Sequence, residues 1–261
     1  METPSSATQV NRKPFHFAGV DIQNPEREKS FDLVIEASKQ KPVRVSWVYA
    51  NCANILRKDA DYLRAAQNFE FVFNDGAGIE IASRVLGNPM TVNLCGTDWI
   101  PDLLEKLNRE KSPYTRIFLL GATEQNIASA ASRFPGLFPN LVLTGSHSGF
   151  FNKPEDVINA LKAAKAEVLV VGTGVPRQEK FLFEHWGEIA DTGIRIAVAG
   201  GAIIDHFAGA VTRAPMIWRK MRMEWLYRLL CEPKRLWQRY LIGNLVFFWH
   251  LLFDWIKSKK R

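Results

Sequence analysis

An aspartate at the end of a short apolar segment is the residue of this sequence best suited to acid–base chemistry. Asp75 follows the apolar run 69–74 and precedes Gly76-Ala77-Gly78, where a helical pattern begins. In an α/β protein a carboxylate at this place faces the ligand cleft, and the glycines let a substrate approach the backbone. Asp75 is therefore a candidate general base for an attacking hydroxyl, and Gly76 a candidate substrate contact. A helix N-cap or turn aspartate explains the same fragment equally well.

A second segment has the composition of an anion-binding helix start. Gly172-Thr173-Gly174 follows an apolar run, Pro176 would begin a helix, and Gln178 and Glu179 fall in its first turn. Free backbone N–H groups at such a start suit a phosphate, and Gln178 could bond a base or a sugar. The glycine spacing matches neither the dinucleotide fingerprint nor the Walker loop, which argues against NAD and ATP. An ordinary capped helix start is the alternative.

Other polar groups are weaker candidates. Thr97 and Asp98 suit a helix N-cap, and His147 lies in a loop where it could contact a sugar or phosphate. Asp59-Ala60-Asp61 is similar to a metal-binding Asp-x-Asp motif, but it falls inside a helical pattern, where residues two apart point to different faces. The three cysteines are widely spaced and match no zinc or disulfide pattern. We therefore expect no metal site.

These residues lie between alternating strand and helix patterns. The predicted strands are Val43–Tyr49, Phe69–Asn74, Arg116–Gly121, Leu141–Thr144, Glu167–Gly172 and Arg195–Ala199. The predicted helices are Ala53–Asn68, Gly78–Leu86, Asp98–Glu110, Glu124–Phe134, Pro154–Lys165 and Pro176–Ile189. This alternation predicts an α/β fold with a Rossmann-like, mostly parallel sheet and helices on both faces. Ligands of such sheets bind at the C-terminal ends of the strands, which selects loops 74–76, 121–123, 146–149, 172–174 and 200–201.

The last fifth of the chain has a different composition. Residues 211–261 hold 12 lysines and arginines against three acidic residues, a net charge of +9, whereas the whole chain carries +7. After Arg213-Ala214-Pro215 only helical patterns follow, at 216–230 and 234–256. The apolar run 241–256 is shorter than the roughly 20 residues of a spanning helix, and basic residues flank it. It predicts a helix in the interface of an anionic membrane. A helix that docks on the protein, or a dimer interface, is the alternative.

The remaining composition narrows the class of protein. Hydrophobic residues make up 47% and charged residues 23% of the chain, which excludes a disordered protein. Residues 1–10 are polar and have no apolar signal segment, so we expect an enzyme that stays in the cytoplasm.

Taken in order, the motifs resemble those of the WecG/TagA/CpsF family of bacterial glycosyltransferases. They are Asn74-Asp75-Gly76-Ala77-Gly78, Gly96-Thr97-Asp98, Gly121, His147-Ser148-Gly149-Phe150, Gly172-x-Gly174-x-Pro176-x-Gln178-Glu179, Gly200-Gly201, Ala208-Gly209, Arg213-Ala214-Pro215 and Glu224-Trp225-Leu226-Tyr227-Arg228-Leu229-Leu230-x-Glu232-Pro233. The likeness extends from about residue 43 to residue 240, with order and spacing preserved. The ordered set, rather than any single motif, is specific.

The resemblance implies an inverting transfer from a UDP-sugar to a polyprenyl-diphosphate-linked sugar, without a metal or other cofactor. Asp75 matches the presumed base of the family, and Asn51 and Gln178 match residues near the donor or acceptor. Arg228, Arg235 and Arg239 match tail arginines that reach diphosphates, and arginine suits bidentate phosphate contacts. The other predicted substrate-binding residues are Gly76, Thr97, Asp98, Gly121, His147, Gly172, Gly174, Glu179, Gly201 and Arg213.

Three positions depart from the family pattern. Tyr49-Ala50-Asn51 stands in place of Thr-Pro-Asn, Asn93 in place of an arginine, and Ile204 in place of a phenylalanine. We expect them to border the sugar pocket, so UDP-N-acetylmannosamine, UDP-glucose and a uronic-acid donor all stay open.

The expected organisation is a catalytic domain over residues 1–212 and a helical appendage over residues 213–261. The appendage would add arginines to the active site and hold the enzyme peripherally on the cytoplasmic face of the inner membrane. Self-association into a homo-oligomer stays open. A non-catalytic scaffold of polysaccharide assembly and a nucleic-acid-binding module are alternatives. The tail aromatics lie among leucine, valine and phenylalanine and form no known nucleic-acid motif, which disfavours the latter.

Overall fold

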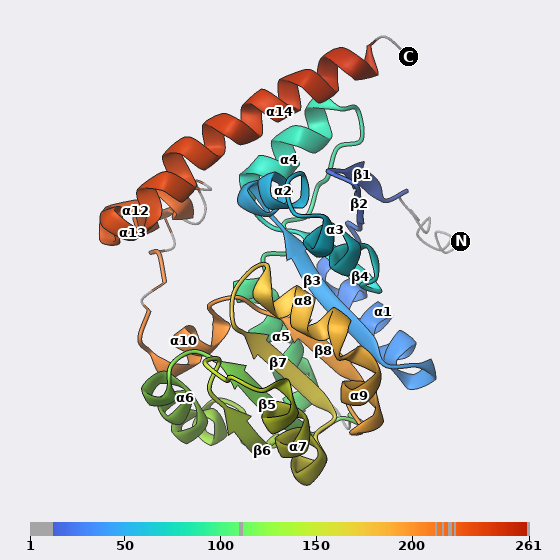
Figure 1. Ribbon diagram of the computed structural model, residues 1–261, viewed down its shortest axis with the longest axis vertical. Coiled ribbons are helices and arrows are strands. Elements are labelled where there is room, and N and C mark those ends of the chain that lie inside the picture. The colour runs from blue at the N-terminus through green and yellow to red at the C-terminus, as the bar shows by residue number, and fades with distance from the viewer. Residues whose placement is uncertain are drawn as a thin grey trace, which may run out of the picture.

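Six parallel strands form the central sheet of the computed structural model (Figure 1). Their order across the sheet is β4 (Phe71–Asn74), β3 (Val43–Val48), β8 (Ile196–Ala199), β7 (Val168–Gly172), β5 (Arg116–Gly121) and β6 (Val142–His147). Each neighbouring pair is parallel, so all six carboxyl ends lie on one edge of the sheet. The structure describes residues 13–109, 112–211, 213–215, 217–218, 221 and 223–259, apart from the side chain of Arg235.

The central strands are apolar on both faces, as strands covered by helices on both sides must be. Val168 and Val170 of β7 point into one apolar cluster, and Leu169 and Val171 point into the other. The helices of the first cluster are α1 (Arg27–Gln40), α5 (Gly96–Arg109), α6 (Glu124–Leu137) and α10 (Ile203–Ala208). Those of the second are α2 (Ala50–Leu56), α3 (Ala60–Gln67), α4 (Gly76–Val85), α7 (Pro154–Ala164), α8 (Arg177–Glu184) and α9 (Trp186–Asp191). The predicted fold class is confirmed, and all six predicted strands are present. The strand predicted at Leu141–Thr144 extends further, so His147, which was expected in a loop, ends β6.

Two predicted helices are wrong in extent. The segment 53–68 covers the end of α2, which stops at Leu56, and the whole of α3. Asp59 caps this second helix: its side chain accepts a hydrogen bond of 2.9 Å from the Tyr62 N–H. The segment 176–189 is divided at His185 into α8 and α9. The antiparallel pair β1 (Phe15–Phe17) and β2 (Val20–Ile22), and the helices α1 and α10, were not predicted. Three-residue strands are too short to show a periodic pattern.

A cluster of aromatic rings supports the carboxyl ends of β3 and β4. Trp99 of α5 is fully buried against Phe31, Trp47 and Phe73, with ring centroids 5.1–5.5 Å apart. The indole N–H of Trp99 donates to Ser30 Oγ at 2.7 Å, and that of Trp47 donates to the Leu94 carbonyl at 2.5 Å. Buried rings with satisfied N–H groups form a firm base for the loops above them.

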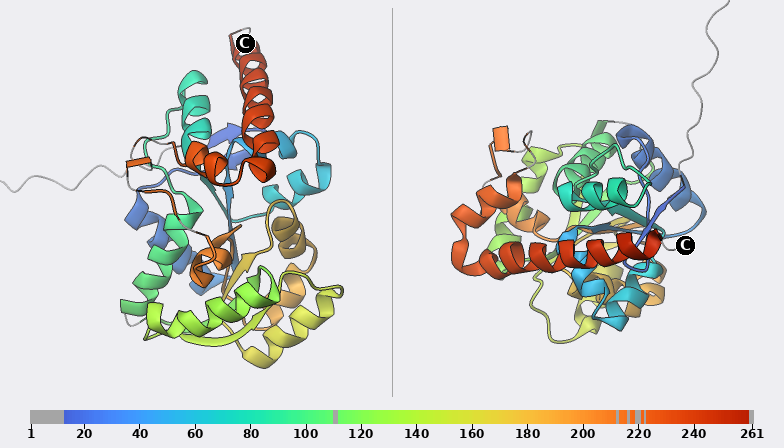
Figure 2. Two further views of the ribbon diagram at one scale, coloured as in Figure 1. Left: turned by 90° about the vertical axis from the view of Figure 1, so that its left-hand side faces the viewer. Right: turned by 90° about the horizontal axis from the view of Figure 1, so that it is seen from above.

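The tail contains α12 (Glu224–Cys231), α13 (Pro233–Trp237), the π-helical turn η1 (Gln238–Ile242) and α14 (Gly243–Ser258). Of the predicted helix 216–230, Ile217 and Trp218 are helical and α12 begins at Glu224, while some of the residues between them lie outside the described ranges. Figure 2 shows α14 as the outermost helix at one end of the molecule. It docks through the buried side chains Phe247 and Leu251, and through an ion pair of 2.5 Å between Arg57 and Asp254.

None of the described helices has both the length and the apolar content needed to cross a membrane. The polar segment 1–10, on which the cytoplasmic prediction depended, lies outside the described residues.

We expect Gly121→Ala to destabilise the fold, because β5 and β7 touch through backbone atoms at this point. Gly121 has a φ of +150°, and an added Cβ would lie 2.5 Å from the carbonyl oxygen of Gly172. The free energy of unfolding, measured by urea denaturation, should fall by about 3 kcal/mol. The control is Gly136→Ala in α6, where a Cβ would meet nothing within 4 Å. Equal denaturation midpoints for the two variants would contradict this account.

Candidate active site

One cavity of about 500 Å³ lies over the carboxyl edge of the sheet. Residues that follow each of the six strands contribute to its wall, as expected for a parallel sheet. The predicted site residues that line it are Asn51, Asp75, Thr97, Gly172, Gly174, Gln178, Gly201, Arg228 and Arg239. The wall does not include Gly76, Asp98, Gly121, His147, Glu179 or Arg213, and the side chain of Arg235 lies outside the described residues.

Asp75 occupies the N-cap position of α4 but does not act as a side-chain cap. Its backbone is extended, with φ −130° and ψ 122°, and its carboxylate makes no capping hydrogen bond. The carboxylate instead lines the cavity, where it accepts a hydrogen bond from the Cys95 thiol. Desolvation raises the pKa of Asp75, and the negative charge of Glu224 raises it further. The hydrogen bond from Cys95 and the positive charges of Arg228 and Arg213 lower it in part. A raised pKa makes this carboxylate a stronger base than an exposed aspartate.

A hydrogen-bond network of asparagines fixes the loop around Asp75, and this network was not predicted from the sequence. Fully buried Asn74 donates to the Val92 carbonyl at 2.8 Å and accepts from Asn24 Nδ2 at 2.9 Å. The Gly76 N–H donates to Asn93 Oδ1 at 3.1 Å, from a backbone with a φ of +81°. An asparagine in an apolar strand is the sequence signal that could have revealed this network, since buried amides require hydrogen-bond partners.

Two tail arginines reach the cavity. The Arg239 guanidinium stacks 4.8 Å from the ring centroid of Tyr49, and its Nε is buried without a hydrogen-bond partner among the described residues. Arg228 is held by Glu224 at 3.3 Å, one helical turn earlier in α12. A buried guanidinium N–H without an acceptor is costly, so this end of the cavity is suited to an anion.

Asp98 and Arg213 join the tail to the α/β domain. Arg213 forms an ion pair with Asp98, donates to the Thr97 carbonyl at 3.2 Å, and lies 3.8 Å from Glu224. Glu224 in turn holds Arg228. The charges thus alternate from α5 into α12, and the two predicted residues Asp98 and Arg213 bind one another beside the cavity.

Gln178 and Glu179 hold the strand ends together. The Gln178 amide donates to the Ala199 carbonyl at 3.0 Å and to Glu179 Oε1 at 2.9 Å, and its oxygen accepts from the Gly201 N–H at 2.9 Å. Both amide hydrogens are therefore used within the protein. Glu179 is fully buried and also accepts from Ser46 Oγ at 2.9 Å, so β3, β8 and α8 meet at this pair.

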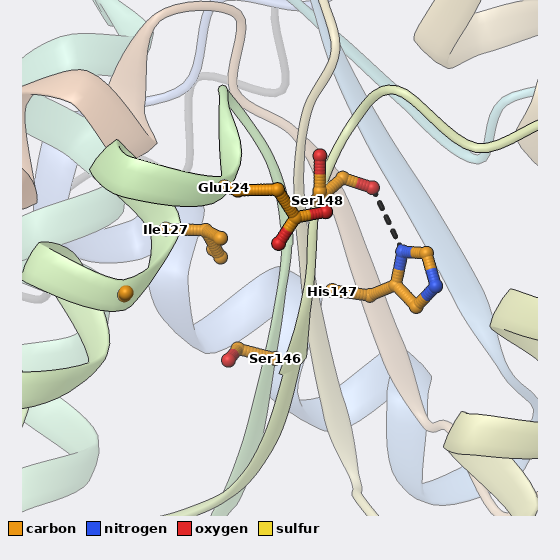
Figure 3. Close-up of a pocket in the computed structure, with 6 residues that line it drawn as sticks. Glu124, Ile127, Ser146, His147 and Ser148 are labelled. Carbon is orange, nitrogen blue, oxygen red and sulfur yellow. Dashed lines mark hydrogen bonds between the residues drawn. The ribbon is translucent and has the colours of Figure 1, made fainter.

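His147 lies apart from the main cavity, beside a smaller one of about 230 Å³ (Figure 3). Figure 3 shows Ser146 and the His147 ring on opposite sides of β6, as alternation along a strand requires. The ring bonds the Ser148 carbonyl at 2.8 Å and packs edge-on against Phe151.

The described residues form no group of three or more His, Cys, Asp or Glu side chains that could hold a metal ion. Within the Asp-x-Asp segment, the Asp59 carboxylate accepts from the Tyr62 N–H at 2.9 Å and from Lys180 Nζ at 2.7 Å.

Burial makes the stability of the fold depend on the charge of Glu179. Desolvation raises its pKa to about 7, against the opposing hydrogen bonds from Gln178 and Ser46. The folded state thus holds a proton that the unfolded state releases above about pH 4.5, so stability falls as pH rises through 7. Between about pH 6 and pH 8 the wild type should lose about 1 kcal/mol of unfolding free energy through this group. Glu179→Gln should remove that loss in urea denaturation, and Glu184→Gln, exposed on the same helix, should leave it in place. An unchanged pH dependence in Glu179→Gln would contradict the assignment.

Comparison with known proteins agrees with this geometry. The model of the glycosyl transferase WecG/TagA/CpsF family matches residues 15–261. Two similar relatives are N-acetylglucosaminyldiphosphoundecaprenol N-acetyl-beta-D-mannosaminyltransferases. The protein of Bacillus spizizenii is 30% identical over 180 residues, which are 69% of this chain and 67% of the relative. That of Bacillus subtilis is 30% identical over 197 residues, which are 76% and 74% of the two chains. The chain belongs to the WecG/TagA/CpsF family of glycosyltransferases.

Proposed function

We propose that this glycosyltransferase moves a sugar from a UDP-sugar to a polyprenyl-diphosphate-linked sugar, with inversion and with Asp75 as the general base. The observation that supports this best is the placement of a carboxylate and two tail arginines, Arg228 and Arg239, around one cavity. The relatives act on a diphosphoundecaprenol-linked N-acetylglucosamine, as their names state. An acceptor of this class carries a diphosphate, which calls for cations, and a hydroxyl, which calls for a base.

The chemical step needs one proton acceptor. The acceptor hydroxyl attacks the anomeric carbon of the donor, a new C–O bond forms, and the bond from that carbon to the UDP oxygen breaks. Asp75 takes the hydroxyl proton, and UDP leaves with the electron pair. A partly desolvated carboxylate that lines the cavity and makes no capping bond is suited to this role.

The departing diphosphate needs cations beside it and a protein backbone that it can approach closely. Arg228 and Arg239 supply the cations, and the glycine-rich loops 172–174 and 200–201 line the same cavity. Cations that lie where negative charge develops stabilise the transition state more than the bound substrate. These contacts of the chain itself would stabilise the leaving group, and we propose that the reaction needs no metal.

Among the three departures from the family pattern, Tyr49 is the one that lines the cavity. Asn93 bonds the Gly76 N–H, and Ile204 is fully buried beneath Gly172. We therefore assign donor discrimination to Tyr49. A panel of UDP-N-acetylmannosamine, UDP-glucose and a UDP-uronic acid, offered with a synthetic lipid-diphosphate sugar, distinguishes the donors.

The tail is proposed to hold the enzyme peripherally on an anionic membrane, at the cytoplasmic face where the lipid-linked acceptor would be presented. One face of α14 packs on the protein through Phe247 and Leu251, while Leu245 and Trp249 are 72% and 60% exposed. Lys257 and Lys259 follow these side chains at the end of the helix. An exposed apolar stripe with adjacent lysines suits an interfacial helix. The division into a catalytic domain over residues 1–212 and an appendage that completes the site follows from the same proposal.

Asp75→Asn should abolish transfer and leave UDP binding intact, because the amide keeps the shape of the side chain but cannot take a proton. We expect a loss of at least a hundredfold in kcat. Radiolabelled product formation and UDP titration calorimetry measure the two effects. The control is Asp102→Asn, a surface aspartate paired with Arg27 at 2.6 Å, which should retain full activity. Substantial transfer by Asp75→Asn would remove Asp75 as the base.

The double substitution Leu245→Ser with Trp249→Ser should release the enzyme from vesicles of phosphatidylglycerol and phosphatidylethanolamine. Both side chains are exposed, so the fold should persist while membrane affinity falls about tenfold or more. Vesicle co-sedimentation measures the bound fraction. A matched control removes two exposed apolar side chains far from the tail, Leu137→Ser with Val142→Ser. If both double variants bind vesicles equally, α14 is not the attachment site.

A further inference from the structure

His206 of α10 contacts the tail at the edge of the cavity. Its Nε2 lies 3.3 Å from Arg228 Nη2, and a guanidinium can only donate. The imidazole must therefore accept at Nε2 and carry its hydrogen on Nδ1. A backbone hydrogen bond with Val211 also acts on the ring. His206 thus contacts Arg228 as a neutral ring.

Both positive and negative side chains surround His206. Two arginines act on the ring, Arg228 of α12 and Arg213 of the preceding segment. Glu224 of α12 forms an ion pair with each of them. Asp205, the adjacent residue on α10, accepts a hydrogen bond of 2.8 Å from Asn126 of α6. On the remaining sides, Asp98 of α5 is paired with Arg213, and Arg133 of α6 donates to the Ala208 carbonyl.

We propose that His206 is a positioning residue: its neutral imidazole fixes Arg228, and with it α12, over the active-site cavity, and its protonation releases this contact. This inference deepens the proposed function, since Arg228 belongs to the proposed diphosphate site. A protonated ring has no acceptor for Arg228 and places a third cation beside Arg228 and Arg213. Both effects weaken the docking of α12.

The direction of the pH dependence follows from burial and charge. Desolvation, together with Arg228 and Arg213, lowers the pKa of His206 to about 4, while Asp205 and the backbone of Val211 oppose the shift. A histidine released from these neighbours titrates near 6.5. The undocked state therefore binds a proton more readily. The contribution of His206 to docking is complete above about pH 6.5 and is lost as pH falls toward 4.

Hydrogen exchange of the α12 amides tests this inference without any transfer assay. On the full-length protein, protection of segment 224–231, corrected for intrinsic exchange, should fall about tenfold between about pH 7 and pH 5. His206→Gln keeps an acceptor on a side chain of similar reach and does not titrate, so its protection should stay constant over the same range. His206→Phe removes the acceptor and should lower protection at every pH.

A matched control addresses the other groups that titrate in this range. His185→Gln changes a histidine that contacts Glu188 at 3.3 Å, outside the tail contact, and should keep the wild-type pH dependence. In a transfer assay, KM for the lipid-linked acceptor should rise at low pH in the wild type and stay level in His206→Gln.

Equal pH dependence of α12 protection in the wild type and His206→Gln would overturn the inference. So would unchanged protection in His206→Phe. A wild type that shows the exchange behaviour but transfers no sugar at any pH would refute the proposed function and leave the role of His206 in docking intact.

Discussion

Alternating charges between α5 and α12 are the interaction on which the cavity depends. Asp98, Arg213, Glu224 and Arg228 follow one another across the junction of the α/β domain and the tail, and each is partly withdrawn from water. Desolvation makes an isolated charge costly here, whereas a paired one is tolerated. The junction therefore favours one arrangement in which every charge meets its opposite. These ion pairs hold the tail residues in place near the cavity.

The same constraint explains how one site can hold a basic carboxylate and cations together. Asp75 is raised in pKa by burial, yet Arg228 and Arg213 act against that rise, so its basicity depends on where the tail lies. Arg239 of η1, further along the tail, also reaches the cavity and stacks on Tyr49 of the α/β domain. A tail that moved away would remove Arg228 and Arg239 from the cavity and change the pKa of Asp75 at the same time. The position of the tail and the charges and pKa values within the cavity are therefore electrostatically coupled.

The placement of α14 connects this chemistry to a surface. The helix packs on α2 next to Asn54, whose side chain bonds the Gly243 carbonyl at 2.7 Å, and exposes its other face. Since α2 follows β3 at the carboxyl edge of the sheet, the exposed face lies at the cavity end of the molecule (Figure 1). A lipid-linked acceptor held at such a surface would have its diphosphate near the arginines of the tail.

The sequence alone determined the parallel sheet and the loops that form the site, because strands buried on both faces need continuous apolar runs and their glycine-rich ends are local features. Asp75 could be selected for the same reason, whereas the tail arginines were selected through the resemblance to the family. Other properties depended on contacts between distant segments. Gln178 lines the cavity, yet its amide bonds Ala199 and Gly201, and Glu179 lies outside the cavity wall and bonds Ser46. His206, which has no motif of its own, meets Arg228 only where the tail packs beside α10. The local sequence pattern specifies which backbone groups meet at the edge of a sheet. The partner of a polar side chain is decided by tertiary packing, because a buried polar group must bond the nearest suitable group.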